Sequence, residues 1–296
     1  MPLRSWTDFL ATRPPRTGYV GRYAPSPTGD LHLGNLRTAL GAWRECRAKS
    51  GTFILRIEDI DIPRTVAGSE RRIVEDLKWL GIDWEEGPDA GGPAAPYRQS
   101  ERSEIYRAAL EHLQDIGLVY PCRCSRKDLR SAASAPHGPE GPEGPIYPGK
   151  CRPENGNAPL PGEEVAWRFR VDRDPIIEFA DLELAARRMN LEAESGDFVV
   201  LRRDGLWAYQ LACAVDDGLM GVTHVVRGAD LVTSTFRQIA ILRALQLPVL
   251  QYRHLPLVLD VAGNRMSKRD GSDGIRGLEA KGLARQEILA LIGGQP

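Results

Sequence analysis

The 296-residue sequence predicts an α/β protein in which a parallel sheet is interrupted by an irregular insertion. Strand-like and helix-like segments alternate at the start of the chain, and a similar alternation returns after residue 200. The stretch between 120 and 165 is rich in proline and glycine and contains the direct repeat Gly-Pro-Glu, which is untypical of regular elements. A nucleotide-binding sheet that carries an insertion accounts for both observations.

The first part of the chain reads as a strand, a helix and a second strand. "TGYVGRYA" (17–24) and "TFILRIED" (52–59) have the apolar content of short buried strands. Between them, before Gly51, apolar residues recur at helical spacing, at Leu36, Ala39, Leu40 and Trp43. Such a crossover gives parallel strands, and ligands of parallel sheets bind beyond the carboxyl ends of the strands. His32 and the acidic cluster from Glu58 to Asp61 both follow such ends.

The later elements are predicted from periodicity and from turn residues. We expect helices at 68–80 and 100–116, a strand in "AWRFRV", a hairpin turn at Asp204-Gly205, a strand at 223–228, and a helix at 234–247 with a Ser/Thr cap and a stop at Pro248. The tail from Leu278 to Leu291 accommodates one or two helices.

These elements predict four segments. A catalytic domain begins with 18–115, an insertion subdomain occupies 116–200, the catalytic domain continues over 201–255, and a loop region with a short helical tail occupies 256–296.

Composition restricts the classes of partner. Lys plus Arg (39) nearly balances Asp plus Glu (40), so any contact with nucleic acid must come from a local patch. The first residues lack the apolar core of a signal peptide, and no apolar run approaches membrane-spanning length. We therefore expect a cytoplasmic protein with no membrane partner. Five cysteines, of which only Cys122 and Cys124 are close, argue against a disulfide framework.

The stretch "PSPTGDLHLGN" joins the first strand to the first helix. Pro25 and Pro27 stiffen the backbone, Gly29 permits a turn, and Gly34 leaves space at the helix start. Free N–H groups and the positive end of a helix dipole attract phosphate, and an imidazole at this point can donate to a phosphate oxygen. The alternative for His32 is a buried, hydrogen-bonded side chain in a turn.

A basic stretch, "VLDVAGNRMSKRDGS" (258–272), lies near the other end of the chain. Alone, it reads as a solvated charge run. Together, "PSPTGDLHLGN" and "RMSKR" resemble the two signatures of class I aminoacyl-tRNA synthetases, His-Ile-Gly-His and Lys-Met-Ser-Lys-Ser. Asn35 replaces the last histidine of the first signature. Arg265 and Arg269 depart from the second, so Ser267 and Lys268 are its matching core.

Further stretches resemble the glutamate-specific members of that class across most of residues 18–272. They are "RYAPSPTGDLHLGNLRTAL", "RIEDIDIPR", "YQLACAVDD" and "VVRGADLVTSTFRQ". The resemblance implies a Rossmann-type catalytic domain and a set of residues around L-glutamate: Arg22, Tyr23, Ala24, Pro25, Ser26, Glu58, Tyr209 and Arg227.

The chemistry of these residues suits a substrate with two carboxylates and one ammonium. Arg22 and Arg227 can each hold a carboxylate, and Glu58 can face the ammonium. Tyr209 can add a hydroxyl donor. The alternative for Arg227 is a structural ion pair with Asp230 or Asp217, and for Glu58 a surface acid at the end of a strand.

The resemblance also implies an ATP site made by His32, Gly34, Asn35, Ser267 and Lys268, with His32 and Lys268 as catalytic residues. The implied reaction is attack of the glutamate α-carboxylate on the α-phosphorus, which gives glutamyl-adenylate and pyrophosphate. Mg²⁺ is expected with ATP, and positioning and positive potential do most of the work.

Cys122-x-Cys124 and Tyr147-x3-Cys151 bring three thiols and a phenol to the irregular segment. Zinc prefers four ligands with thiolates among the best, and a loop without a core gains stability from such a clamp. A partial site completed by His137 or water, and unpaired core thiols, remain as alternatives. The pattern resembles the zinc site of short relatives of the glutamate enzymes, with Tyr147 as the least usual ligand.

The chain has a length similar to that of a truncated branch of this family, which lacks the anticodon-binding domain. This resemblance implies an enzyme that activates glutamate without tRNA and transfers it to queuosine in the anticodon of tRNA(Asp). Two alternatives stay open. One is a compact glutamyl-tRNA synthetase that charges the tRNA 3′ end, and the other is a non-catalytic tRNA-binding module.

Overall fold

The computed structural model describes residues 4–125, 128, 140–141, 144–155, 163–257 and 274–293. The chain divides into two compact units. Unit 1 comprises Met1–Arg13, Arg102–Met220 and Val232–Val249, and unit 2 comprises Pro14–Glu101, Gly221–Leu231 and Leu250–Pro296. Among the described residues, no helix is long and apolar enough to cross a membrane.

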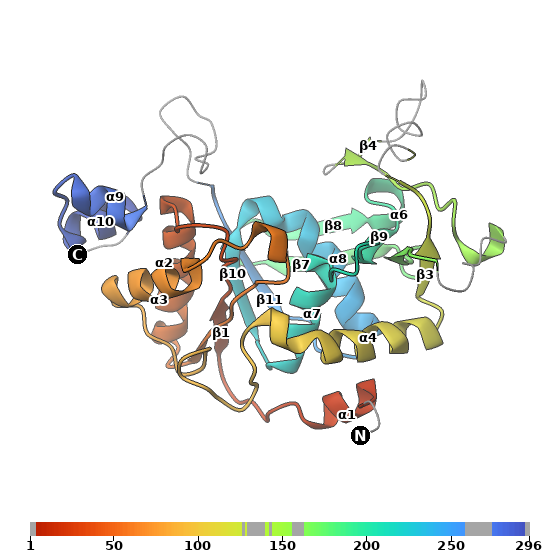
Figure 1. Ribbon diagram of the computed structural model, residues 1–296, viewed down its shortest axis with the longest axis horizontal. Helices are drawn as coiled ribbons and strands as arrows, with labels where there is room; N and C mark the ends of the chain where they lie inside the picture. The colour runs from red at the N-terminus through yellow and green to blue at the C-terminus, as the bar shows by residue number, and fades with distance from the viewer. Residues whose placement is uncertain are drawn as a thin grey trace. The chain divides into compact units, whose positions relative to one another are not determined.

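The helices and strands alternate over much of the described chain (Figure 1). The helices are α1 (Trp6–Ala11), α2 (Leu33–Ala48), α3 (Ser69–Trp79), α4 (Ser103–Asp115), α6 (Leu191–Glu194), α7 (Tyr209–Leu219), α8 (Val232–Ala244), α9 (Ile275–Ala280) and α10 (Arg285–Leu291). The strands are β1 (Val20–Tyr23), β2 (Thr52–Leu55), β3 (Val119–Cys122), β4 (Glu140–Gly141), β5 (Gly144–Pro145), β6 (Ala166–Phe169), β7 (Ile176–Asp181), β8 (Ala185–Asn190), β9 (Phe198–Leu201), β10 (His224–Gly228) and β11 (Gln251–Leu255).

Unit 2 contains four parallel strands in the order β2-β1-β10-β11. Strand β1 pairs with β2 from Val20↔Thr52 to Tyr23↔Leu55, and α2 makes the crossover between them. These strands are almost continuously buried, as expected for a parallel sheet covered on both faces. The predicted strand–helix–strand unit is confirmed, and the carboxyl ends of its strands lead into the candidate site.

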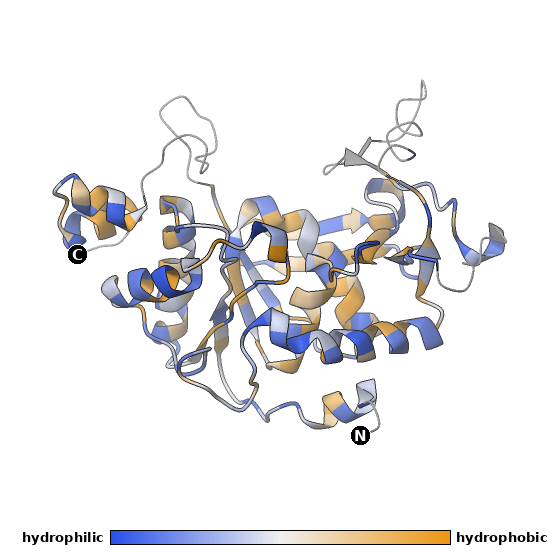
Figure 2. Cartoon of the chain, viewed as in Figure 1, coloured by the Kyte–Doolittle hydropathy of each residue, from blue (hydrophilic) through white to orange (hydrophobic). Residues whose placement is uncertain are grey.

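Unit 1 combines α-helices with antiparallel strands. Strands β3, β6 and β9 form a three-stranded sheet, and β7 and β8 form a hairpin. Helix α7 is coloured as hydrophobic along much of its length, whereas α4 is mixed (Figure 2). Arg102 and Asp216 form a buried ion pair at 2.6 Å, and the Tyr106 hydroxyl donates to the other oxygen of Asp216 at 2.8 Å.

Some predicted element boundaries need correction. Helix α8 begins at Val232, because the 3₁₀ turn Ala229–Leu231 leads directly into it, so Ser234 and Thr235 are buried inside the helix and do not cap it. The turn at Asp204-Gly205 is confirmed, since Leu201 and Trp207 bridge across it. Helix α7 and the hairpin β7–β8 are findings of the structure alone.

Candidate functional site

His32 is the N-cap of α2. Its Nδ1 accepts hydrogen bonds from the backbone N–H groups of Gly34 (3.1 Å) and Asn35 (3.3 Å), and the Asn35 side-chain oxygen accepts from the His32 N–H (3.4 Å). This is a capping box in which an imidazole replaces the usual hydroxyl. Two of the helix N–H groups expected to be free for phosphate are therefore engaged by His32 itself.

The cap determines which nitrogen of the imidazole carries the proton. Because Nδ1 accepts, the neutral ring carries its proton on Nε2, which makes Nε2–H a donor. The side chain is partly buried and hydrogen-bonded to its own helix, which agrees in part with the alternative of a buried, hydrogen-bonded histidine in a turn, and a contact with phosphate stays a prediction. Gly34 leaves room for the ring, since a Cβ there would lie 3.0 Å from His32 Cε1 and would press on the imidazole.

The segments predicted to bind glutamate converge at the carboxyl ends of β1 and β2. The Arg56 N–H donates to the Tyr23 carbonyl and the Glu58 N–H donates to the Pro25 carbonyl, both at 3.0 Å. Ala24 is half-buried in the same loop, and Ser26 is exposed. Two of the four stretches that resemble the glutamate-specific members, those around Tyr23 and Glu58, thus lie side by side through backbone hydrogen bonds.

Charged side chains are buried at this edge of the sheet. Arg22 is 5% exposed and donates through Nη1 to the Val226 carbonyl at 3.2 Å, which connects it to β10 next to Arg227. Glu58 is 7% exposed, so the alternative of a surface acid is wrong. Burial and the nearby Glu58 carboxylate both raise the pKa of Tyr23.

Arg227 is oriented by contacts within unit 2. It is buried, its Nε donates to His254 Nε2 at 3.2 Å, and its guanidinium lies 5.6 Å from the centre of the Tyr252 ring. Because His254 Nε2 accepts, its imidazole is neutral here. These contacts hold a planar cation at the carboxyl end of β10.

Arg56 is a charged residue that sequence reasoning missed. It is fully buried, and its Nη2 donates to Glu58 Oε1 at 2.9 Å. The signal was present, because residues two apart in an extended segment lie on the same face. The guanidinium of Arg56 partly neutralises the carboxylate that would face the substrate ammonium.

Three predicted site residues belong to unit 1 or fall outside the described residues. Tyr209 is the first residue of α7 in unit 1 and is partly buried. Ser267 and Lys268 fall outside the described residues, as does His137. Both flanks of the segment 258–273 are in unit 2: the Leu257 side chain lies against Gly228, and Gly274 lies against the Leu31 carbonyl.

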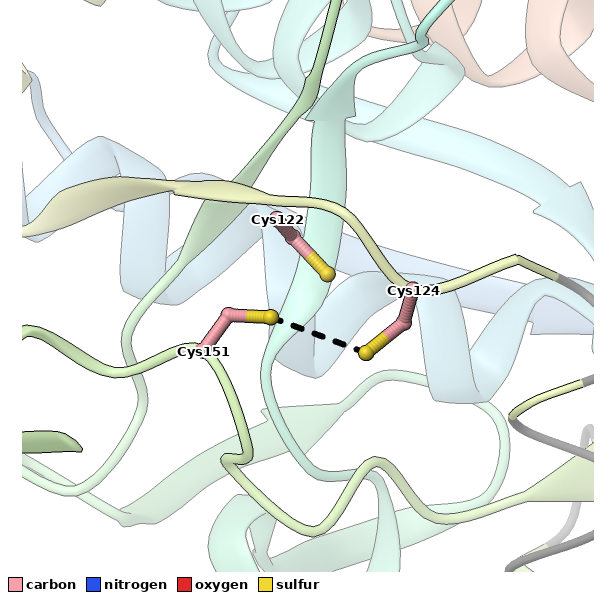
Figure 3. Close-up of side chains that lie close together, drawn as sticks. All are labelled: Cys122, Cys124 and Cys151. Carbon is pink, nitrogen blue, oxygen red and sulfur yellow. Dashed lines mark hydrogen bonds between the residues drawn. The ribbon is translucent and has the colours of Figure 1, made fainter. Parts of the chain in front are cut away.

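The thiols of Cys122, Cys124 and Cys151 converge on one point in unit 1. Their sulfur atoms lie within 4.8 Å of one another, and those of Cys124 and Cys151 are 3.6 Å apart. Figure 3 shows the three side chains directed toward a shared centre from two segments of the chain. The Tyr147 hydroxyl oxygen lies 3.4 Å from Cys122 Sγ and 3.8 Å from Cys124 Sγ.

This ligand set fits zinc. Ligand atoms about 2.3 Å from a tetrahedral centre stand about 3.8 Å from one another, which is close to the spacing of these atoms. The three thiols are free, without a disulfide among them. Among the described residues, the buried cluster around them is small, and Tyr120 and Tyr147 are its only members besides the cysteines, so a metal would add cohesion to it.

The thiols differ in acidity. Burial and the adjacent Cys122 raise the pKa of Cys124 to about 11. For Cys151, burial opposes ionisation, but hydrogen bonds from the Tyr147 hydroxyl and the Arg123 backbone outweigh it and lower the pKa to about 7. Burial, with hydrogen bonding to Cys122, raises the pKa of Tyr147. Of these two thiols, Cys151 is therefore the more acidic.

Comparisons with a family model and with individual known proteins indicate the same family. Residues 19–293 match the model described as "tRNA synthetases class I (E and Q), catalytic domain". The chain is 52% identical over 273 residues to a Symbiobacterium thermophilum protein named glutamyl-Q tRNA(Asp) synthetase, and the match covers 91% of this chain and 84% of that protein.

Longer proteins are similar as well. Glutamate–tRNA ligase 2 of Acidithiobacillus ferrooxidans is 47% identical over 92% of this chain and 57% of its own length. A crystal structure of a glutamate tRNA ligase from Elizabethkingia meningosepticum, in complex with its amino acid, is 33% identical with a TM-score of 0.72. That match covers 86% of this chain and 52% of the ligase, so this chain spans about half of the longer ligase.

Proposed function

This chain belongs to the class I tRNA synthetases of the glutamate and glutamine type, and we propose that it activates L-glutamate with ATP in the cytoplasm and transfers the glutamate to queuosine in the anticodon of tRNA(Asp). It is a ligase with a glutamyl-tRNA-synthetase-like function. The observation that supports queuosine as the acceptor is the 52% identity to a relative named for that reaction, matched over 84% of its length.

Recognition of glutamate rests on the buried charges of unit 2. Arg22 and Arg227 are planar cations that can each hold one carboxylate, and Glu58 offers the counter-charge for the ammonium. Because all three side chains are less than a tenth exposed, water competes weakly with these contacts.

Activation of glutamate builds negative charge on the phosphates of ATP. The glutamate α-carboxylate attacks the α-phosphorus, and pyrophosphate leaves with its bonding electrons. The Nε2–H of His32 is set by its cap to donate to a phosphate oxygen, and Ser267 and Lys268 would contact the same phosphates. Mg²⁺ would accompany ATP as part of the substrate.

Zinc is proposed at Cys122, Cys124, Cys151 and Tyr147. The convergence of the three sulfur atoms and the phenol oxygen supports this proposal. When bound, the metal would tie the segment 144–155 to the end of β3. No catalytic step requires it.

The activation step is tested by ATP–pyrophosphate exchange with glutamate, glutamine or aspartate, each with and without tRNA. Exchange with glutamate alone supports tRNA-independent activation. Exchange that requires tRNA favours the alternative of a compact glutamyl-tRNA synthetase, because the resemblance implies that the longer enzymes need tRNA for this step.

The acceptor is tested by transfer of labelled glutamate to tRNA(Asp) that contains queuosine, to tRNA(Asp) that lacks it, and to tRNA(Glu). Label on the first alone supports the proposed acceptor, especially if it survives removal of the 3′-terminal nucleoside. Label on tRNA(Glu) that is lost with that nucleoside would contradict it.

The variant Lys268→Ala distinguishes an enzyme from the alternative of a non-catalytic tRNA-binding module. Loss of one phosphate-facing charge should lower exchange by about 10²–10³-fold. Binding of tRNA should change little, since a single cation contributes a small part of a salt-dependent affinity. No exchange in the wild-type protein under any condition would favour the module.

A further inference from the structure

Arg168 contacts two of the proposed zinc ligands at once. It lies in β6, is 6% exposed, and donates from Nε to Cys122 Sγ at 3.2 Å. Its guanidinium carbon is 3.9 Å from the centre of the Tyr147 ring. A buried cation therefore lies directly on the sulfur of one ligand and on the aromatic face of another.

The position of Arg168 is fixed by its surroundings. β6 is the central strand of the sheet β3-β6-β9, so its backbone is paired on both sides, and Arg168 stands opposite Tyr120 and Val199. Nη1 donates to the Asp197 carbonyl at 2.7 Å. The donor directed at Cys122 is therefore held in place before any metal binds.

The Asp197 segment also anchors the other half of the ligand set. Its buried carboxylate accepts from Arg152, the residue after Cys151, at 2.8 and 3.0 Å, and from the Tyr120 hydroxyl at 2.5 Å. Both segments that carry cysteines are thus tied to one residue. This arrangement keeps the sulfur atoms close.

Charge balance explains why a cation is needed there. Three thiolates around a divalent cation leave one net negative charge, and a phenolate ligand adds another. Negative charge in a buried site is unfavourable unless a cation is paired with it. Arg168 supplies that cation through a charge-assisted hydrogen bond to sulfur and a contact with the tyrosine face.

We propose that Arg168 is a positioning residue of the metal centre, which compensates the charge of the bound ligand set, orients Cys122 and so raises the affinity for zinc. This inference rests on the proposed zinc site. It assigns to β6 a role that the four ligands alone do not reveal, because residues that hold ligands in place contribute much of the affinity of a metal site.

The test is a zinc competition titration of the full chain against a chromophoric chelator. Arg168→Met should weaken zinc binding about 10–100-fold. Arg168→Lys keeps the charge without the planar fork and should fall between wild type and Arg168→Met. The matched control is Arg170→Met: Arg170 is also buried and ion-paired, but its partners are Asp172 and Glu154, so zinc affinity should stay near wild type.

Cobalt can replace zinc as a spectroscopic probe, because the absorption spectrum of bound cobalt reports on its ligands and does not change with a general loss of stability. Thiolate-to-cobalt charge-transfer absorption should shift or weaken in Arg168→Met and remain unchanged in Arg170→Met. Equal zinc affinities and equal cobalt spectra for wild type and Arg168→Met would overturn the proposal.

The outcomes separate this inference from the zinc proposal itself. Wild-type protein that takes up neither zinc nor cobalt removes the zinc site, and the role of Arg168 with it. If wild type binds metal and Arg168→Met does not fold, Arg168→Gln decides: weaker binding than wild type supports the role of the charge, and unchanged binding overturns it.

Discussion

The cysteine site of unit 1 and the histidine loop of unit 2 use their polar groups in opposite ways. In unit 1, three thiols and a phenol gather around a common centre. In unit 2, His32 bonds to its own helix, and Arg56 and Glu58 neutralise one another. The first site can be recognised from geometry alone, because three thiols and a phenol so close together suit the ligands of one shared cation. The second can be recognised only with the family resemblance as well, because each of its polar groups also has a local structural role.

Removal of Arg56 should have the largest effect and would show how far a site residue in unit 2 is structural. Arg56→Met removes the guanidinium that pairs with the buried Glu58 carboxylate, so the free energy of unfolding should fall by about 3–5 kcal/mol. Urea unfolding measures that loss, and the KM for glutamate in the folded fraction should rise.

The matched control for Arg56 is Arg102→Met in unit 1, which breaks the buried pair with Asp216. It should lose comparable stability without a selective rise in the KM for glutamate. Equal KM values for the two variants would show that the pair of Arg56 and Glu58 has no special part in substrate binding.

His32 is the residue at which structural and chemical roles can be separated. Asparagine is a strong N-cap, so His32→Asn should keep the stability of wild type while losing the Nε2–H donor and about 10²–10³-fold in exchange rate. His32→Ala should lose the same rate and about 1 kcal/mol of stability as well. Full exchange activity in His32→Asn would mean that the histidine acts only as a cap.

Metal removal tests the prediction that the cysteine site stabilises the fold only when a metal is bound. At free zinc about 100-fold above the dissociation constant, wild type should gain about 2.7 kcal/mol of stability over its chelated form. Cys124→Ser should gain much less, because a hydroxyl is a poor replacement for a thiolate. Thermal unfolding with and without chelator measures the difference, and an equal response of both proteins would contradict a site at these cysteines.

Gly34→Ala should have the smallest effect on stability. Alanine favours the helix by about 1 kcal/mol over glycine, but its Cβ would press on His32 and weaken a cap of similar value, so the two terms nearly cancel. The displaced imidazole should lower the exchange rate about tenfold. A variant that matches wild type in exchange would show that the cap geometry does not position the donor.

The sequence predicts the parts of the fold whose signals are local. Strand and helix periodicity places β1, α2, β2 and β10, and the Cys-x-Cys spacing places two sulfur atoms together. Helix α7 is buried on most sides, so it lacks the alternation of apolar and polar residues that indicates an amphipathic helix.

Contacts that depend on register or on long-range pairing are not readable in this way. Arg168 meets Cys122 only because β6 pairs with β3 with Cys122 opposite Ala166, and no local pattern specifies that alignment. The capping role of His32 was missed for a different reason. Histidine is an unusual N-cap, so the loop pattern suggested a ligand contact and left a hydrogen-bonded side chain in a turn as the alternative, without identifying Gly34 and Asn35 as its partners.

The described residues on both sides of the segment 258–273 lie in the unit that carries His32. Leu257 lies against Gly228 at one flank, and Gly274 lies against the carbonyl of Leu31, next to His32, at the other. The contact with ATP phosphates that the proposed function assigns to Lys268 would then be made within one chain, and it would not depend on the concentration of the protein.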